Sequence, residues 1–366
     1  MKQKILLTVF SLVVSIIICE IILGLLNLPK FYKAHSSPPQ FQFSLLENGE
    51  LFYTNSRSQK ITFTYESNPR GYFDKENKVV HTTNSMGFRG KEFSEHKDKN
   101  IIRIAFLGDS FTFGEGVKDQ DIFTQQIEIS LNKKSTIRKY ECLNFGVGGY
   151  NTEQSLFLLK HIVVYFSPDA VVLCYTLNDV EPELFYYEKK SKSIKRKPRE
   201  AYIPEGLSNE MPPVSIMYKL RISKLVWQIF YRRNISRRTI QYYHSLYAQT
   251  QLWNRNQQSL IEFIAFCKKN KIECYIAILP LLYKLNENYP FVNLHKKVEN
   301  AISDDNMIIE ILPDLIGKND TDLWVHPTDQ HPNEIAHKLI ADKISKAILT
   351  TFHKSAATDP DSARGN

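Results

Sequence analysis

A serine follows an apolar run, in a position suited to nucleophilic chemistry. The β-branched run Ile101–Leu107 predicts a buried strand, and Gly108, Asp109 and Ser110 come directly after it. A hydroxyl on a sharp turn at the carboxyl end of a strand lies where open α/β sheets bind ligands, and there it can act as a nucleophile. Gly, Asp and Ser are also common turn residues, so this interpretation depends on partners further along the chain.

Three later blocks supply such partners in order. Asn144–Asn151 follows the strand-like run Tyr140–Leu143, Leu177–Asp179 closes the run Ala170–Tyr175, and Asp329–Asn333 precedes the last predicted helix. A serine nucleophile needs a base within hydrogen-bond reach, and the base needs a group that fixes its tautomer. Ser110 is therefore the candidate nucleophile and His331 the candidate base.

The four blocks together resemble the SGNH (GDSL-type) hydrolase family, whose signature residues are a Ser, a Gly, an Asn and a His. The matched positions are Ser110, Gly149, Asn178 and His331. The resemblance covers roughly residues 84 to 350, and four ordered blocks make a specific signal. The segment from Asn84 to Gly90 is similar to the lead-in of membrane-anchored bacterial members.

The resemblance implies an oxyanion hole and an orienting acid. The hole would consist of the backbone N–H groups of Ser110 and Gly149 and the side-chain amide of Asn178. The acid of the family commonly lies three residues before the histidine, where this chain has Thr328. Asp-x-His-Pro-Asn also occurs in anchored relatives, so we assign Asp329 as the orienting acid.

Two alternatives concern the same loop. Asp322 is the second candidate for the orienting acid. His326, Asp329 and His331 could instead bind zinc, but hydrolytic zinc needs ligands from a rigid frame, and this set would leave Ser110 idle. We therefore expect neither a metal nor a cofactor.

Strand and helix patterns alternate through most of the chain. Beyond the strands already named, we expect strands at Ile272–Leu279 and Met307–Ile311. We expect helices at Ile122–Leu131, Gln258–Lys269 and Glu334–Leu349. A further helix would be capped by Thr152 and would carry Leu156, Leu159, Val163 and Phe166 on one face. Such units predict an α/β fold, a three-layer α/β/α sandwich with a central, mostly parallel sheet of about five strands.

We expect five parts along the 366 residues. They are a signal anchor or transmembrane helix (1–28), a connector containing Pro38 and Pro39 (29–83), a hydrolase domain (84–353), an insertion within it at about 181–245, and a disordered tail (354–366). The insertion carries no strand signal. Its aromatic residues either stack on sugar rings or pack the insertion onto the domain: Tyr186, Tyr187, Tyr202, Trp227, Tyr242 and Tyr243.

The N-terminus predicts a membrane anchor. The apolar stretch Ile5–Leu28 is long enough to cross a bilayer, and no clear cleavage site follows it, which favours an uncleaved anchor over a cleaved signal peptide. Lys2 and Lys4 place the N-terminus in the cytoplasm and the remaining domain in the periplasm or outside the cell. Glu20 is costly inside a bilayer, so we expect it to snorkel, to be protonated or to meet a partner helix.

The charge distribution indicates the class of binding partner, and the cysteine spacing indicates the state of the thiols. The net charge of +8 is concentrated in Lys189–Arg199 and Arg232–Arg238, and no nucleic-acid motif accompanies it. Anionic headgroups or an acidic glycan are more natural partners for an exported domain than nucleic acid. None of the five cysteines has CxxC spacing, so buried free thiols are expected, with a disulfide as the open alternative.

The resemblance and the predicted location together indicate a serine ester hydrolase that acts by two-step acyl transfer. Its substrate would be an acylated, for example acetylated, exported glycan or lipid. Two alternatives stay open: an O-acyltransferase of the same fold, and a catalytically silent glycan-binding or assembly protein.

Overall fold

A parallel sheet of five strands forms the centre of the protein. The structure is a computed structural model that describes residues 1–30, 36–37, 41–45, 51–135, 138–196, 219–302 and 304–357. The strands lie in the order β11-β10-β7-β5-β6, and every neighbouring pair is parallel. They are β5 (Ile101–Gly108), β6 (Lys139–Gly146), β7 (Ala170–Tyr175), β10 (Glu273–Ile278) and β11 (Ile308–Glu310).

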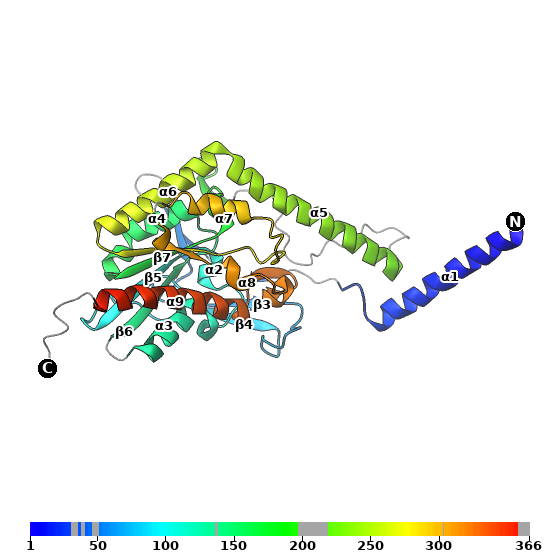
Figure 1. The fold of residues 1–366 in the computed structure, drawn as a ribbon, viewed down its shortest axis with the longest axis horizontal. Helices are drawn as coiled ribbons and strands as arrows, with labels where there is room; N and C mark the ends of the chain where they lie inside the picture. Colours follow the sequence, from blue (N-terminus) through cyan, green and yellow to red (C-terminus); the bar gives the residue numbers. More distant parts are fainter. Residues whose placement is uncertain are drawn as a thin grey trace.

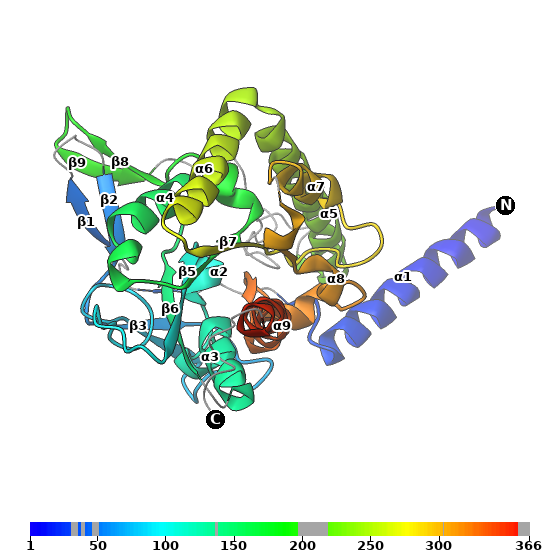
Figure 2. The ribbon, with the colours of Figure 1, turned by 60° about the vertical axis from the view of Figure 1, so that its left-hand side comes forward.

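Helices cover both faces of this sheet. On one face, α3 (Phe123–Lys134) packs against α9 (Glu334–Ala357); on the other, α4 (Thr152–His161) packs against α6 (Thr250–Lys269) (Figure 1, Figure 2). Because both faces are covered, a central strand such as β7 is buried at all six positions. The predicted three-layer α/β/α fold is confirmed.

The strand order determines where the sheet opens. Counted along the chain, the five strands lie in the order 2-1-3-4-5, with β5 between β6 and β7. In such sheets, the crevice lies at the carboxyl ends of the first and third strands, where the direction of winding reverses. Ser110 follows β5 and Asn178 follows β7, so both stand beside this crevice.

The region between the N-terminal helix and the sheet contains two antiparallel hairpins. The strand β1 (Phe41–Leu45) pairs with β2 (Leu51–Asn55), and β3 (Lys60–Thr64) pairs with β4 (Lys78–Thr82). The second hairpin forms a small core of its own with three residues of the main domain: Val117, Ile122 and Val325. Pro38 and Pro39 lie outside the described residues.

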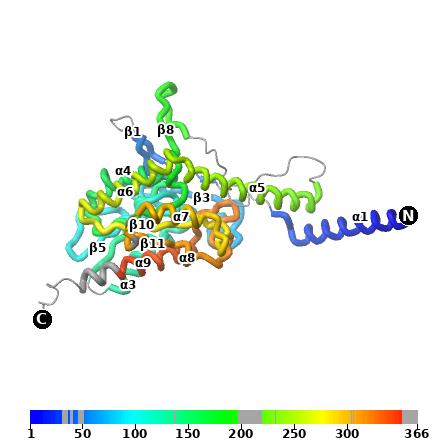
Figure 3. The backbone as a smooth tube through the Cα atoms, turned by 45° about the horizontal axis from the view of Figure 1, so that its top comes forward, coloured from blue at the N-terminus to red at the C-terminus, as the bar shows by residue number. Residues whose placement is uncertain are grey.

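The N-terminal helix α1 (Lys2–Leu25) extends away from the rest of the protein, as Figure 3 shows. None of its residues is buried, and its mean hydropathy reaches 2.8 over an 18-residue window. Its length and composition suit a membrane span, and they suit a signal sequence equally well.

The insertion differs from its prediction. It contains a hairpin of β8 (Phe185–Glu188) and β9 (Ser193–Arg196), followed by the long helix α5 (Arg221–Ala248). The expectation of no strands was wrong, because the aromatic residues of β8 favour a strand although the lysines around them suggest a solvated loop. Tyr202 and the rest of 197–218 lie outside the described residues.

Several element boundaries also differ. The cap of α4 is Asn151 rather than Thr152: its Oδ1 accepts the Gln154 N–H at 3.0 Å, and Gln154 Oε1 accepts the Asn151 N–H at 3.2 Å. The helix ends at His161, so the predicted positions Val163 and Phe166 lie in a separate 3₁₀ turn. The helix α6 begins at Thr250, and α9 continues to Ala357, past the predicted start of the tail; 358–366 lie outside the described residues.

Short elements complete the described structure. The short helices are α2 (Ser110–Phe113), α7 (Val292–Glu299) and α8 (Leu312–Leu315), and β12 (Trp324–His326) pairs with β13 (Asp329–Pro332). The 3₁₀ turns are Asp119–Asp121, Val163–Phe166, Leu177–Val180, Asp305–Met307 and Asp320–Leu323. All five cysteines are free thiols, and four of them are buried.

Gly146, at the end of β6, allows the backbone of α2 to approach closely. A Cβ there would lie 2.7 Å from the carbonyl carbon of Thr112 and closer still to the Phe113 nitrogen. We expect Gly146→Ala to lower the free energy of unfolding by about 1–3 kcal/mol, because backbone cannot yield as a side chain does. Denaturant unfolding of the full-length protein in detergent would measure this.

Gly148→Ala is the matched control. Its added Cβ would first meet the ring edge of Phe41, at 3.2 Å, which can move. Equal destabilisation by the two substitutions would contradict the close approach as the cause.

Candidate active site

Ser110 begins the single-turn helix α2 at the end of β5. Asp109 caps this helix, its Oδ1 accepting the Phe111 N–H at 2.9 Å. Gly108 has φ +153°, and a Cβ at this position would lie 2.7 Å from the carbonyl oxygen of Cys174. The chain can therefore turn sharply here only with glycine, and the turn places Ser110 at the carboxyl end of β5.

His331 reaches Ser110 from the other end of the chain. It lies in β13, just before α9, whose first turn is capped by Asn333 through the N–H groups of Ile335 and Ala336. His331 Nε2 lies 2.8 Å from Ser110 Oγ, although the two residues are 221 positions apart. The predicted nucleophile and base are thus within hydrogen-bond reach.

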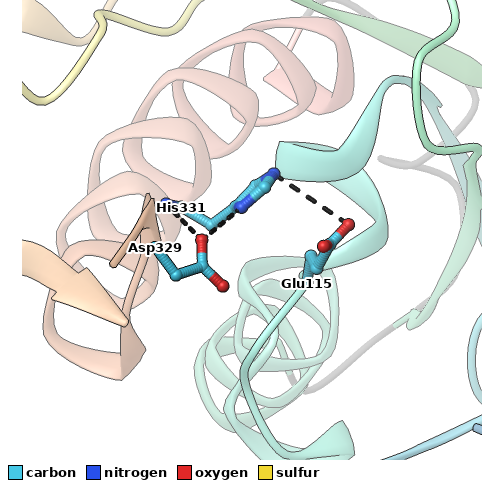
Figure 4. Close-up of side chains that lie close together, drawn as sticks. All are labelled: Glu115, Asp329 and His331. Carbon is cyan, nitrogen blue, oxygen red and sulfur yellow. Dashed lines mark hydrogen bonds and ion pairs between the residues drawn. The ribbon is translucent and has the colours of Figure 1, made fainter. Parts of the chain in front are cut away.

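Asp329 is the acid beside the imidazole. Its Oδ1 lies 2.6 Å from His331 Nδ1 and also accepts the His331 backbone N–H at 3.1 Å (Figure 4). Asp322, the alternative, contributes its backbone carbonyl to Asn333 at 2.7 Å. In the neutral form of His331, with Nδ1–H directed at Asp329, the lone pair of Nε2 faces the serine hydroxyl.

Tyr65 holds the second oxygen of Asp329, a contact that the sequence did not predict. The Tyr65 hydroxyl donates to Asp329 Oδ2 at 2.7 Å, and its ring stacks on Phe73 at 4.4 Å. Burial raises the pKa of Tyr65, and the charge of Asp329 raises it further, so the phenol stays a neutral donor. No pattern signals this pair, because its members are 264 residues apart.

Glu115 is a second residue that sequence reasoning missed. It follows α2, its backbone N–H donates to the Ser110 carbonyl at 3.1 Å, and its Oε2 lies 4.0 Å from His331 Nε2. Figure 4 shows Glu115 and Asp329 on either side of the imidazole. The available signal was an acidic residue five positions after Ser110, between two glycines.

These carboxylates control the charge of His331. Burial disfavours the imidazolium, but the charges of Asp329 and Glu115, with the hydrogen bond that His331 Nδ1–H donates to Asp329, outweigh it and raise the pKa of His331 to about 10. At neutral pH, His331 of the substrate-free protein is therefore an imidazolium, with a proton on both ring nitrogens.

The structure does not bring together His326, Asp329 and His331, the set considered as an alternative zinc site. His326 turns to other partners: its Nε2 lies 3.0 Å from Ser67 Oγ and its Nδ1 lies 2.8 Å from Thr328 Oγ1. Ligand atoms of Glu115, Asp329 and His331 do lie within 4.8 Å of one another. Both ring nitrogens of His331 are already engaged by Ser110 and Asp329, so a cation there would have to displace the serine.

The candidate oxyanion donors lie at the same edge of the sheet. Ser110, Gly149 and Asn178 follow the adjacent strands β5, β6 and β7. Gly149 has φ +79°, and a Cβ there would lie 2.7 Å from Leu184 Cδ2. One N–H of the Asn178 amide donates to Asp109 Oδ2 at 3.0 Å, and the amide carries two such hydrogens.

Asn144 and Asp179 make hydrogen bonds close to the candidate oxyanion donors. Asn144 Nδ2 donates to the Thr112 carbonyl at 2.7 Å, and its Oδ1 accepts the Gly146 N–H at 2.9 Å. Asp179 forms a capping box with Thr176 at the turn that carries Asn178. The first contact joins β6 to α2, and the second stabilises the turn after β7.

The aromatic residues of the insertion have mixed surroundings. Tyr243 is buried against Phe291, at 5.6 Å between ring centroids, which fits a packing role. Trp227 stacks on Tyr231, and Tyr186 is exposed on β8. Their suggested role in stacking on sugars stays a prediction.

Comparison with solved structures returns esterases and lipases. A GDSL-like lipase from Bacteroides thetaiotaomicron is 14% identical with a TM-score of 0.37, covering 71% of this chain and 93% of its own. An esterase from a Pseudoalteromonas species is 14% identical with a TM-score of 0.37, and the match covers 69% of this chain and 99% of the esterase. An acetyl xylan esterase is 18% identical with a TM-score of 0.38, covering 68% and 100%. No family model and no curated protein matches the sequence.

Tyr65→Phe tests the support of Asp329. Removing the hydroxyl takes one hydrogen-bond donor away from a buried carboxylate, so we expect the free energy of unfolding to fall by about 1–3 kcal/mol. Denaturant unfolding measures the change, with Tyr165→Phe as control because Tyr165 is 69% exposed. If Tyr65→Phe is as stable as the control, the hydroxyl does not hold Asp329.

Glu115→Gln tests the electrostatic assignment. Loss of a negative charge beside the imidazolium should lower the pKa of His331 from about 10 by about 1–3 pH units. An NMR titration of histidine-labelled protein would follow the His331 ring directly. Glu273→Gln, at an exposed position at the start of β10, should leave the titration unchanged. An unaltered His331 pKa in Glu115→Gln would refute the role of Glu115.

Proposed function

We propose that this chain is a membrane-anchored serine ester hydrolase of the SGNH (GDSL) type. The observation that carries the proposal is a pair of hydrogen bonds that links three side chains. Ser110 Oγ lies 2.8 Å from His331 Nε2, and His331 Nδ1 lies 2.6 Å from Asp329 Oδ1. A nucleophile, a base and an orienting acid in this geometry have the arrangement that acyl transfer requires.

The mechanism follows from these positions. After His331 loses its proton, Nε2 accepts the Ser110 proton while Oγ attacks the ester carbonyl carbon. The N–H groups of Ser110, Gly149 and Asn178 stabilise the negative oxygen of the tetrahedral intermediate. His331 then protonates the leaving alcohol, and water, activated by the same imidazole, releases the acid from Ser110. Because neighbouring carboxylates favour the imidazolium, turnover should rise with pH towards the pKa of His331.

The proposed substrate is an O-acylated, for example acetylated, exported glycan or lipid. The helix α1 would serve as an uncleaved anchor in the inner membrane, with Lys2 and Lys4 in the cytoplasm and the catalytic domain in the periplasm or outside the cell. The insertion begins beside the site, since Leu184 lies against Gly149 and Phe185 packs on Tyr53 at 5.1 Å. Segments placed in this way shape access to a site.

Ser110→Ala and Asn178→Ala test this function on the full-length protein. A fluorophosphonate probe should label the wild type and not Ser110→Ala. Asn178→Ala should lower ester turnover by about 100- to 1,000-fold, since one oxyanion donor is lost. Asn254→Ala, exposed on α6, should behave as wild type.

Three results would count against the proposal. Equal labelling of the wild type and Ser110→Ala would favour a catalytically silent binding protein. A loss of less than about threefold in Asn178→Ala would remove that amide from the oxyanion hole. Acyl transfer to an added glycan in preference to water would identify an O-acyltransferase instead.

A further inference from the structure

The first half of α5 carries an exposed apolar face. Val226, Ile229 and Phe230 are 47%, 44% and 65% exposed, and they lie on one side of the helix because they are three and four positions apart. Leu220, just before the helix, is 45% exposed as well. A cluster of this kind, on a helix that otherwise packs on the domain, indicates a surface that meets another apolar phase.

The same side of the helix becomes basic further along. Arg233 and Arg237 continue the line of Phe230 at helical spacing, Arg238 lies beside them, and all three are exposed. At 1.5 Å per residue, Phe230 and Arg237 lie about 10 Å apart along the axis. Acyl chains and phosphate groups follow each other over a comparable distance at a membrane surface.

The start of α5 is joined to α1. The Glu20 carboxylate accepts the backbone N–H of Arg221 at 2.9 Å and that of Ile222 at 2.8 Å. Arg221 Nη1 also donates to the Leu28 carbonyl at 3.1 Å. Glu20 thus meets a partner helix, one of its three expected fates, and its negative charge at a helix N-terminus is favourable.

These contacts set the level at which α5 begins. Glu20 lies five residues before the end of α1 at Leu25, which is about 8 Å along the axis. From there α5 runs back towards the domain (Figure 1, Figure 3), and Gln228 Nε2 donates to the Lys30 carbonyl at 2.8 Å. If α1 spans a bilayer, the first turns of α5 therefore lie at its outer surface.

We propose that residues 220–230 lie in the outer interface of the bilayer that α1 crosses. Val226, Ile229 and Phe230 contact acyl chains, and Arg233, Arg237 and Arg238 bind anionic phosphate groups. The inference rests on the proposed anchor. The aromatic pair Trp227 and Tyr231, stacked at 6.2 Å, suits the same depth, since such rings prefer the interface. The occupant is lipid because the apolar face lies on a helix whose start is joined to α1, and because this face ends in cationic residues.

Nitroxide probes on the full-length protein test this inference. The protein is reconstituted in vesicles of phosphatidylcholine and phosphatidylglycerol, and each probe is tested for collision with oxygen, enriched in lipid, and with a water-soluble nickel chelate. Phe230→Cys is labelled in a Cys19→Ser background, since the other four cysteines are buried. Native Cys19 reports on α1, and Tyr165→Cys, in the same background, reports on exposed protein surface. A denaturant unfolding transition like that of the wild type shows that each variant is folded.

We expect the probe at position 230 to collide with oxygen as strongly as the probe at Cys19, and the probe at position 165 to collide with the chelate. Lipid exposure at Cys19 with water exposure at 230 would overturn the inference and leave the anchor intact. Protection of position 230 from both reagents would overturn it in favour of a protein partner. Water exposure at both Cys19 and 230 would overturn the anchor as well.

Discussion

The hydrogen bond between Ser110 Oγ and His331 Nε2 is 2.8 Å long, and it requires that two separately supported elements hold these atoms together. Ser110 depends on β5 and on the turn at Gly108, whereas His331 depends on β13 and the start of α9. The packing of α3 against α9 fixes one relative to the other. At their contact, the Phe123 N–H donates to His337 Nδ1 at 3.1 Å. Burial, together with nearby positive charge, lowers the pKa of His337 to about 3, so this imidazole stays a neutral acceptor.

Electrostatics adds a second constraint on the same bond. Carboxylates approach His331 from two sides, Asp329 at Nδ1 and Glu115 near Nε2. Asp329 orients the ring, but its charge and that of Glu115 also favour the protonated form that cannot accept a proton from Ser110. In the proposed mechanism, the same charges stabilise the imidazolium that forms when Ser110 attacks. The site would then favour the charged intermediate of that reaction at the expense of the resting base.

The sequence predicted those parts of the site that depend on residues close together in the chain. The apolar runs before Ser110 and Asn178 gave the strands, and the loop around His331 contained its acid two residues away. The contact between Tyr65 and Asp329 was not predicted, because a side-chain contact across 264 residues leaves no pattern in the sequence. The cap of α4 was misplaced by one residue because Asn151 and Thr152 are both good caps and only the fold selects between them. In β8, aromatic residues outweighed the lysines that suggested a loop.

The β3–β4 hairpin, which carries Tyr65 on its connecting segment, lies in the chain between α1 and the sheet. If α1 is the proposed anchor, the stretch that tethers the domain also contributes a side chain to the candidate site. A proteolytic cut between Tyr65 and β4 would break the covalent link between this phenol donor and the domain that carries Asp329. A cut nearer to α1 would free the domain together with this support. The position of cleavage in the tether would thus decide whether a soluble form retains the complete site.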